Sequence, residues 1–243
     1  MSEKSKWIIV VIFAAAMAWV ESAVVVYLRT RIDRVEPYQT NPLPMFGGLG
    51  HIELGREAAT LVMLLTVGWL AGKTRRSRIG YAAIAFGVWD IGYYILLAPM
   101  SGWPRSIFDW DILFLLPLPW WGPVIAPASI AALMIVGGTL ITRLDARAAA
   151  PMPRRSIWGL SCLGAALALY VFMADALHAS SHGTEAIRHV LPTSFNWGLF
   201  TLAFALMSAP VVDLARQTIS HQKPVNSSPA AMRNQAPDCP ITN

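Results

Sequence analysis

Six long apolar stretches run through the chain, and a short polar segment separates each from the next. An α-helix rises about 1.5 Å per residue, so about 20 apolar residues are needed to cross the hydrocarbon layer of a bilayer. The stretches cover residues 7–28, 53–72, 79–100, 113–141, 157–179 and 191–212. The pattern predicts an all-α, polytopic integral membrane protein built as a bundle of six transmembrane helices.

The fourth stretch differs from the others because four prolines lie in its first half. They are Pro117, Pro119, Pro123 and Pro127. A proline lacks a backbone donor, so four of them do not fit one regular helix. Broken backbone at membrane depth is tolerated only where protein buries it or where it lines a cavity. We therefore predict a Pro-broken fourth span. Its outer part either shapes a pocket or lies at the interface before a normal helix that begins near Ala126.

The chain becomes polar after Ala215, and its last part, KPVNSSPAAMRNQAPDCPITN, holds few apolar residues. Such a segment does not bury enough apolar surface to offset the entropy lost on ordering. The sequence therefore predicts a six-helix transmembrane domain over residues 1–215 and a disordered cytoplasmic tail over residues 216–243.

Composition supports the membrane class. Hydrophobic residues make up 55% of the chain and charged residues 14%, whereas soluble domains carry about 25% charged residues. The net charge of +5 is explained by basic cytoplasmic loops, and we expect no nucleic-acid partner. Cys162 lies in an apolar stretch and Cys239 in the tail, so no disulfide framework is expected.

The distribution of basic residues predicts the orientation in the membrane. With the N-terminus in the cytoplasm, thirteen Lys and Arg residues lie on the inner side and six on the outer side. We therefore expect an integral protein of the plasma (inner) membrane with both termini cytoplasmic. In the alternative, residues 1–18 are a signal peptide cleaved after Ala18, which leaves five spans without changing their orientation.

Several ionisable residues lie inside or directly beside the apolar stretches, and in the predicted orientation they lie toward the outer leaflet. They are Glu21, His51, Glu53, Glu57, Asp90 and Asp111. Arg56 follows Glu53 by three residues, so the two are able to pair on a helix. The preceding NPLPMFGGLG segment is expected to be a flexible loop that places His51 over the helix end.

A charge near the bilayer centre costs about 2.5–3.5 kcal/mol, so these groups need a metal ion, an arginine or a proton as partner. Carboxylates from several helices together with one histidine suit a transition metal ion such as Fe, Zn or Mn. In the alternative, the acids pair with Arg29 and Arg56 and accept hydrogen bonds from Tyr93 or Tyr94.

A secondary candidate for a metal site lies further along the chain. Asp175, His178 and His182 follow one another at intervals that place them on one helical face, provided that the helix extends to His182. In the alternative, these histidines cap the end of a span at the membrane interface.

The main functional hypothesis is a metal-dependent enzyme that acts on a lipid-like or apolar substrate, with Glu57 and Asp90 as catalytic residues. The first alternative is a proton- or cation-coupled transporter, or a membrane subunit of a larger complex, that uses the same carboxylates. The second is a structural scaffold held by acid–arginine pairs. Expected partners are membrane lipids and possible partner membrane subunits.

Overall fold

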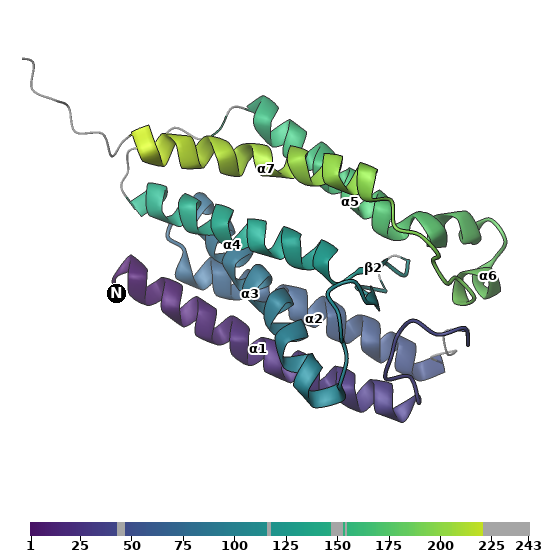
Figure 1. Ribbon diagram of the computed structural model, residues 1–243. Helices are drawn as coiled ribbons and strands as arrows, with labels where there is room; N and C mark the ends of the chain where they lie inside the picture. The colour runs from purple at the N-terminus through teal and green to yellow at the C-terminus, as the bar shows by residue number, and fades with distance from the viewer. Residues whose placement is uncertain (43–46, 116–117, 147–152, 154, 221–243) are drawn as a thin grey trace, which may run out of the picture.

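A computed structural model of the protein describes residues 1–42, 47–115, 118–146, 153 and 155–220 (Figure 1). Within these residues, six helices are long and apolar enough to cross a membrane. They are α1 (Glu3–Arg31), α2 (Gly47–Ala71), α3 (Arg75–Ser101), α4 (Ile125–Ala146), α5 (Arg155–Ser180) and α7 (Trp197–Ser220). The prediction of an all-α chain with six potential membrane-spanning helices is confirmed.

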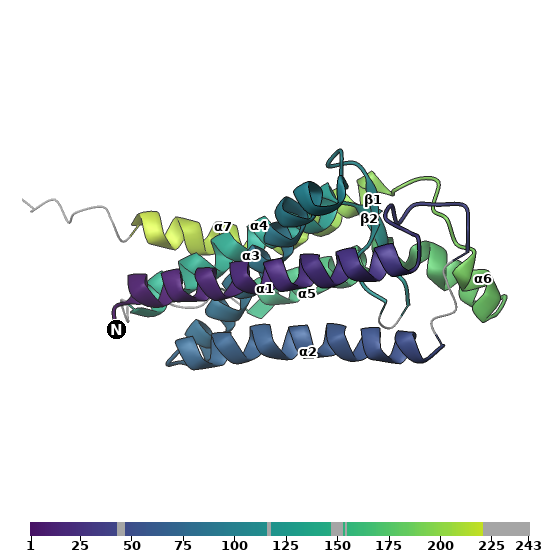
Figure 2. The same cartoon turned by 90° about the horizontal axis from the view of Figure 1, so that it is seen from below.

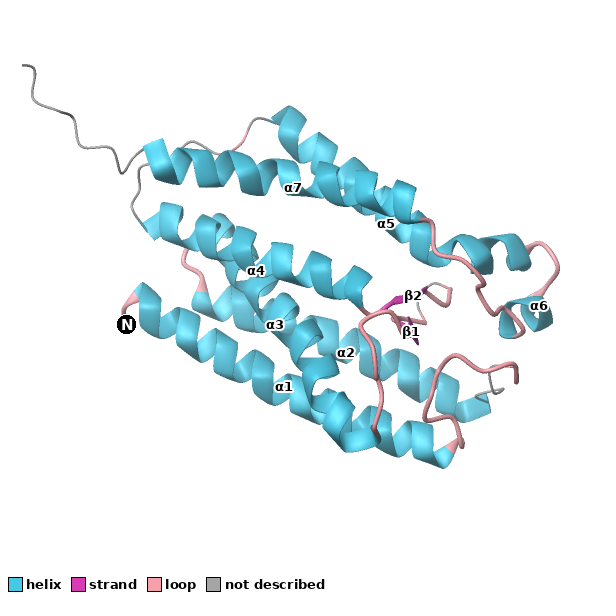
Figure 3. Ribbon diagram, in the orientation of Figure 1, coloured by secondary structure: helices cyan, strands magenta, loops and turns pink. Residues whose placement is uncertain are grey.

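Helix α3 is central to one half of the bundle, because it packs against α1, α2 and α4. Helices α5 and α7 form a close pair, and α7 packs on α4 (Figure 3). Seen from below, α2 lies at the margin of the bundle rather than between other helices (Figure 2). The bundle therefore consists of a four-helix group, α1 to α4, and an added pair, α5 and α7.

Glycines allow α3 and α4 to approach closely. A Cβ atom added to Gly80 would lie 3.0 Å from the carbonyl oxygen of Gly138, and one added to Gly138 would lie 2.9 Å from Cγ1 of Ile84. A Cβ atom added to Gly87 would lie 2.7 Å from Cγ1 of Ile135. Small residues at helix crossings are typical of membrane bundles, where close packing rather than the hydrophobic effect holds helices together.

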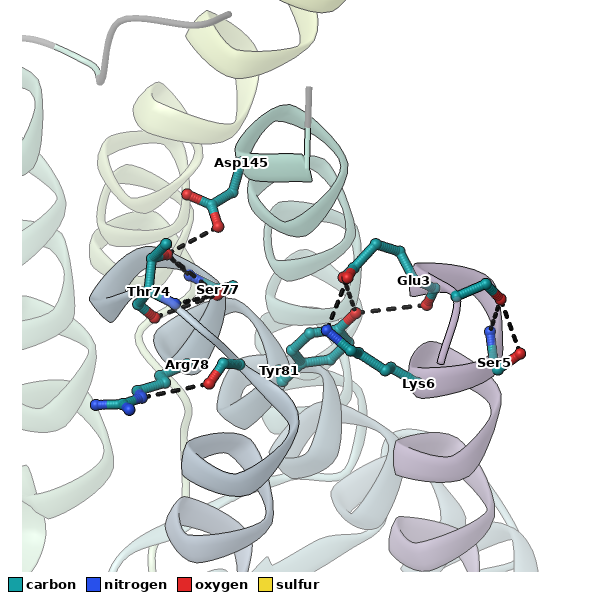
Figure 4. A network of polar contacts seen from close by, with 10 residues as sticks. Glu3, Ser5, Lys6, Thr74, Ser77, Arg78, Tyr81 and Asp145 are labelled. Atoms are coloured by element: carbon teal, nitrogen blue, oxygen red, sulfur yellow. Dashed lines mark hydrogen bonds and ion pairs between the residues drawn. The ribbon is translucent and has the colours of Figure 1, made fainter. Parts of the chain in front are cut away.

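Polar contacts tie three helices together at the end of the bundle that holds the N-terminus (Figure 4). Thr74 and Ser77 form a capping box at the start of α3, and the Thr74 hydroxyl donates to Asp145 of α4 over 2.8 Å. The Tyr81 hydroxyl of α3 donates to the Glu3 carboxylate of α1, also over 2.8 Å. These bonds fix the register of α1, α3 and α4 at this end.

The start of α2 corrects one expectation. The GGLG run, predicted to be a flexible loop, forms the first turn of α2, which begins at Gly47. His51 therefore lies on the helix with an exposed side chain and does not fold back over the helix end. A helix satisfies its own backbone groups, which favours helix over loop near the apolar phase even where glycines are present. Residues 43–46 lie outside the described part of the chain.

The region before α4 forms an antiparallel hairpin instead of helix. Strand β1 (Trp110–Ile112) pairs with β2 (Trp121–Pro123), and Asp111 lies opposite Gly122 in the register. In the described part of the stretch predicted over 113–141, helix therefore begins at Ile125. Pro119 and Pro123 precede the helix, and Pro127 lies in its first turn. Pro117 lies outside the described residues.

Two further boundaries differ from those expected. A short helix, α6 (Thr184–Arg188), follows α5, and the sixth span begins at Trp197 rather than near residue 191. Helix α7 continues to Ser220, past the domain boundary predicted at residue 215. The remainder of the predicted tail, 221–243, lies outside the described residues.

Candidate functional site

A cavity of about 120 Å³ lies at the end of the bundle opposite the N-terminus, between α1, α2, α3 and the chain that follows β1. Three guanidinium groups and five carboxylates are among the groups that line it. They belong to Arg29, Arg34, Arg56, Glu21, Glu53, Glu57, Asp90 and Asp111. The structure therefore brings together five of the six primary site residues predicted from the sequence. The sixth, His51, is exposed and does not line the cavity.

Arg56 of α2 faces two carboxylates at once. It forms ion pairs with Glu21 of α1 and with Glu53, one turn earlier on α2, and its Nε donates to Glu53 Oε2 over 3.0 Å. Thr60, one turn after Arg56, donates to Glu21 over 3.4 Å. Because Glu21 is buried, its ion pair with Arg56 supplies a counter-charge within the protein and also fastens the N-terminal part of α2 to α1.

Arg29 and Asp111 form a second, more deeply buried pair. The Arg29 guanidinium lies 2.7 Å from Asp111 Oδ1 and also donates to the Tyr93 hydroxyl over 3.3 Å. Asp111 accepts further bonds from the Tyr94 hydroxyl and from the Ile112 amide, and only 1% of it is exposed. Burial raises the pKa of the Asp111 carboxyl, and the neighbouring guanidinium opposes that rise. The pair joins α1 to the hairpin, and the hydroxyls of Tyr93 and Tyr94 connect α3 to it.

Glu57 has a much weaker partner than Glu21, Glu53 and Asp111. It is 7% exposed, and both of its carboxylate oxygens accept from a single donor, the backbone amide of Leu115, over 3.2 and 3.3 Å. Within the described part of the chain, Glu57 forms no ion pair. One shared amide hydrogen does not balance a full negative charge in a buried position.

Asp90, near the middle of α3, has a buried carboxylate oxygen that lacks a partner. It lines the cavity, and its Oδ2 atom accepts no hydrogen bond from any described residue. The indole Nε1 of the neighbouring Trp89 is also buried and has no hydrogen-bond partner in the described part of the chain. Buried polar atoms in folded proteins nearly always bond to protein, to ordered water or to a bound species. Asp90 therefore marks a place where a proton, a water molecule or an ion is expected.

The charges that line the cavity do not balance. Five carboxylates against three guanidinium groups leave a formal charge of −2 if all of them are ionised. Arg34 does not offset an acid by direct contact, because its guanidinium donates to the backbone carbonyls of Pro37 and Asn41. Among the described residues, the two cavity acids that remain without a guanidinium partner are Glu57 and Asp90.

The sequence left two interpretations of these acids, namely pairing with arginines and binding of a transition metal, and the structure supports only the first. The expected pairing of acids with Arg29 and Arg56, with a hydrogen bond from Tyr94, is present in the structure. A transition-metal site of Fe, Zn or Mn gains no support. Among the described residues, no group of three or more His, Cys, Asp or Glu side chains is placed to hold a metal ion.

The secondary candidates lie away from the cavity. Asp175 and His178 are exposed on α5, and the His178 ring lies 2.8 Å from the Ala174 carbonyl oxygen. Helix α5 ends at Ser180, so His182 lies in the following turn and not on the helical face that the spacing predicted. The three side chains therefore do not form the stripe expected of a continuous helix.

Sequence reasoning missed three groups that build the site. Thr60 was detectable, because it lies four residues after Arg56 and shares its helical face. Arg34 is buried and holds the turn after α1 through backbone carbonyls, and its basic side chain alone gave no indication of this. The Leu115 amide donates from irregular chain, where no side-chain pattern indicates a donor.

Known proteins give no indication of the function of this chain, so its function is inferred from the site. No protein family, no curated protein and no solved structure matches the chain.

Proposed function

We propose that the protein is a proton-binding membrane protein, either a proton-coupled transporter or the membrane subunit of a transport complex. Glu57 and Asp90 are the groups that take up and release the proton. The observation that carries the proposal is Asp90, which lines a cavity among carboxylates and guanidinium groups and has one carboxylate oxygen that no described residue partners.

The physical argument is the cost of an uncompensated charge. A carboxylate at membrane depth needs a counter-charge or must be neutralised, and a proton is the smallest species that neutralises it. Glu21, Glu53 and Asp111 have guanidinium partners, whereas Glu57 and Asp90 have none among the described residues. Glu57 and Asp90 are therefore the acids that bind and release a proton.

The cavity provides room for proton exchange. A water molecule needs roughly 10–15 Å³ of such space and two to four polar partners. The cavity of about 120 Å³ is large enough for several waters, and charged groups surround it. A short chain of waters would connect Glu57 and Asp90 to the turn after α1, where Arg34 and Pro37 line the cavity.

The test is infrared spectroscopy of the purified full-length protein during a change of pH, which detects the C=O stretch of protonated carboxyl groups. We expect such a signal in the wild type and its loss, in part, in Asp90→Asn and in Glu57→Gln. The matched controls are Asp33→Asn and Glu185→Gln. Asp33 is exposed with a φ of 51°, a conformation that Asn also adopts. Glu185 is exposed on α6.

Unchanged signals in both Asp90→Asn and Glu57→Gln would contradict the proposal. Elemental mass spectrometry of the same samples tests the metal-dependent enzyme. About one equivalent of a transition metal, lost in a Glu57→Ala/Asp90→Ala variant, would replace proton binding by metal binding as the role of these acids.

A further inference from the structure

A second pocket, of about 230 Å³, lies on the segments that follow α1 and α3. Its lining consists of four aromatic and three charged side chains, namely Tyr38, Trp103, Phe108, Trp110, Glu36, Arg105 and Asp109. We propose that this pocket binds an organic ammonium group, such as the trimethylammonium of choline. The inference is independent of the proton-binding function, because none of these seven residues lines the first cavity.

The aromatic rings supply the main attraction. A cation over the face of an indole or phenol ring interacts with the ring quadrupole, and aromatic cages are a known way to bind quaternary ammonium groups. The Trp103 ring already receives one cation, since the Arg29 guanidinium carbon lies 4.5 Å from its centroid. A methylated ammonium forms few or no hydrogen bonds, so rings suit it better than acceptors do.

Two of the rings are held in place by contacts within the protein. The Tyr38 hydroxyl donates to the Pro192 carbonyl over 2.6 Å, and the Tyr38 ring stacks on Trp110 with centroids 6.0 Å apart. The Trp110 and Phe195 rings are packed edge to face, with centroids 6.0 Å apart. Binding therefore does not require ordering of these side chains, which reduces its entropic cost.

The charge of the pocket favours a monovalent cation. Two carboxylates, Glu36 and Asp109, face one guanidinium, Arg105, which leaves a formal charge of −1. Arg105 pairs with Glu36, and Asp109 accepts the backbone amides of Arg105 and Ser106 over 2.7 and 3.1 Å. One organic ammonium ion would bring the pocket to neutrality.

The surroundings allow the ammonium group to come from a lipid or from solution. Phe108, which lines the pocket, is 61% exposed and its chain neighbour Ile107 is 54% exposed, and both lie outside the six potential spans. Exposed apolar side chains next to a span are typical of the membrane interface. A lipid headgroup with an ammonium group and a free ammonium compound share the chemistry that the pocket recognises.

The experiment is calorimetric titration of the full-length protein, in a maltoside detergent without ammonium groups, with choline and with its neutral isostere in which carbon replaces nitrogen. We expect choline to bind roughly 2- to 30-fold more tightly than the isostere, the range of cation–π contributions. Trp110→Leu and Glu36→Gln should weaken choline binding, whereas Trp19→Leu should not, because Trp19 is an exposed residue of α1 that does not line the pocket.

Glu36→Gln keeps the test valid if Trp110→Leu misfolds, because the Glu36 side chain is 45% exposed and carries little packing. The source is decided in nanodiscs. Weaker choline binding in phosphatidylcholine than in phosphatidylglycerol identifies the lipid headgroup as the occupant, and equal binding identifies a soluble ammonium compound. Equal affinity for choline and its isostere, wild-type binding by Glu36→Gln, or no binding of choline in either nanodisc would overturn the proposal.

Discussion

Arg56 shows how single residues hold charge within the apolar part of this protein. Its guanidinium serves Glu21 on the neighbouring helix and Glu53 on its own helix. An ion pair of this kind contributes less to stability than its geometry suggests, because both partners lose water on burial. Removal of one partner is more costly than removal of the pair, since the remaining charge is then buried alone.

We therefore expect Arg56→Ala to destabilise the protein by about 3 kcal/mol, at the lower end of the range for a broken buried pair because Arg56 keeps some exposure. Unfolding in mixed detergent micelles, followed by circular dichroism, measures the change. The double variant Arg56→Ala/Glu21→Ala should recover part of the loss. Equal stability of the two variants would show that Glu21 does not depend on Arg56.

Helix packing is decided at the element scale by glycines that the sequence distributes along α3, α4 and α5. Gly138 of α4 contacts α3 so closely that a Cβ atom would lie 2.9 Å from Ile84 Cγ1 and 3.3 Å from Ala83 Cβ. Gly159 of α5 has no atom within 4 Å of the same added carbon. Substitution of glycine by alanine therefore meets a closely packed neighbour at Gly138 and open space at Gly159.

We expect Gly138→Ala to destabilise the bundle by about 1–3 kcal/mol, because the backbones of α3 and α4 must separate to admit the methyl group. Gly159→Ala is the matched control, and it should be neutral or stabilise by up to about 1 kcal/mol through helix propensity. The midpoint of unfolding in mixed micelles distinguishes them. A shift in the same direction for both variants would contradict the close α3–α4 contact.

At the scale of the whole molecule, the site depends on how the hairpin and the helices meet at one end of the bundle. Asp111 and the Leu115 amide come from the chain between α3 and α4, and they complete a cavity whose other walls are α1, α2 and α3. The opposite end is held by polar contacts around Tyr81 and Thr74. In the predicted orientation, the cavity lies toward the outer face.

That orientation predicts which sites are reachable from outside the cell. In a Cys162→Ser/Cys239→Ser background, Ser106→Cys should react with a membrane-impermeant maleimide in intact cells, because Ser106 is an exposed residue between α3 and β1. Lys73→Cys, in the exposed turn between α2 and α3, should react only after lysis. Labelling of Lys73→Cys in intact cells would reverse the predicted topology and place the cavity toward the cytoplasm.

The sequence by itself determined the number of helices that are long and apolar enough to span a membrane, and it identified most of the acids that line the cavity. These are local properties, because the length of an apolar stretch decides whether a helix can cross a bilayer and a buried charge is visible wherever it interrupts such a stretch. The pairing of Glu53 with Arg56 belongs here too, since their spacing on one helix already brings them together.

Only the tertiary structure decided which acids have partners. Glu21 meets Arg56 across 35 positions, and Asp111 meets Arg29 across 82. Glu57 accepts a hydrogen bond from the backbone amide of Leu115, 58 positions away, and no side-chain pattern in the sequence predicts this contact. His51 was expected in the cluster, but the helix begins earlier and turns it outward. Helix periodicity specifies the face of the helix on which a side chain lies. The packing of the helices and the hairpin determines which groups that face contacts. Among the described residues, this packing gives guanidinium partners to Glu21 and Asp111 but not to Glu57 and Asp90.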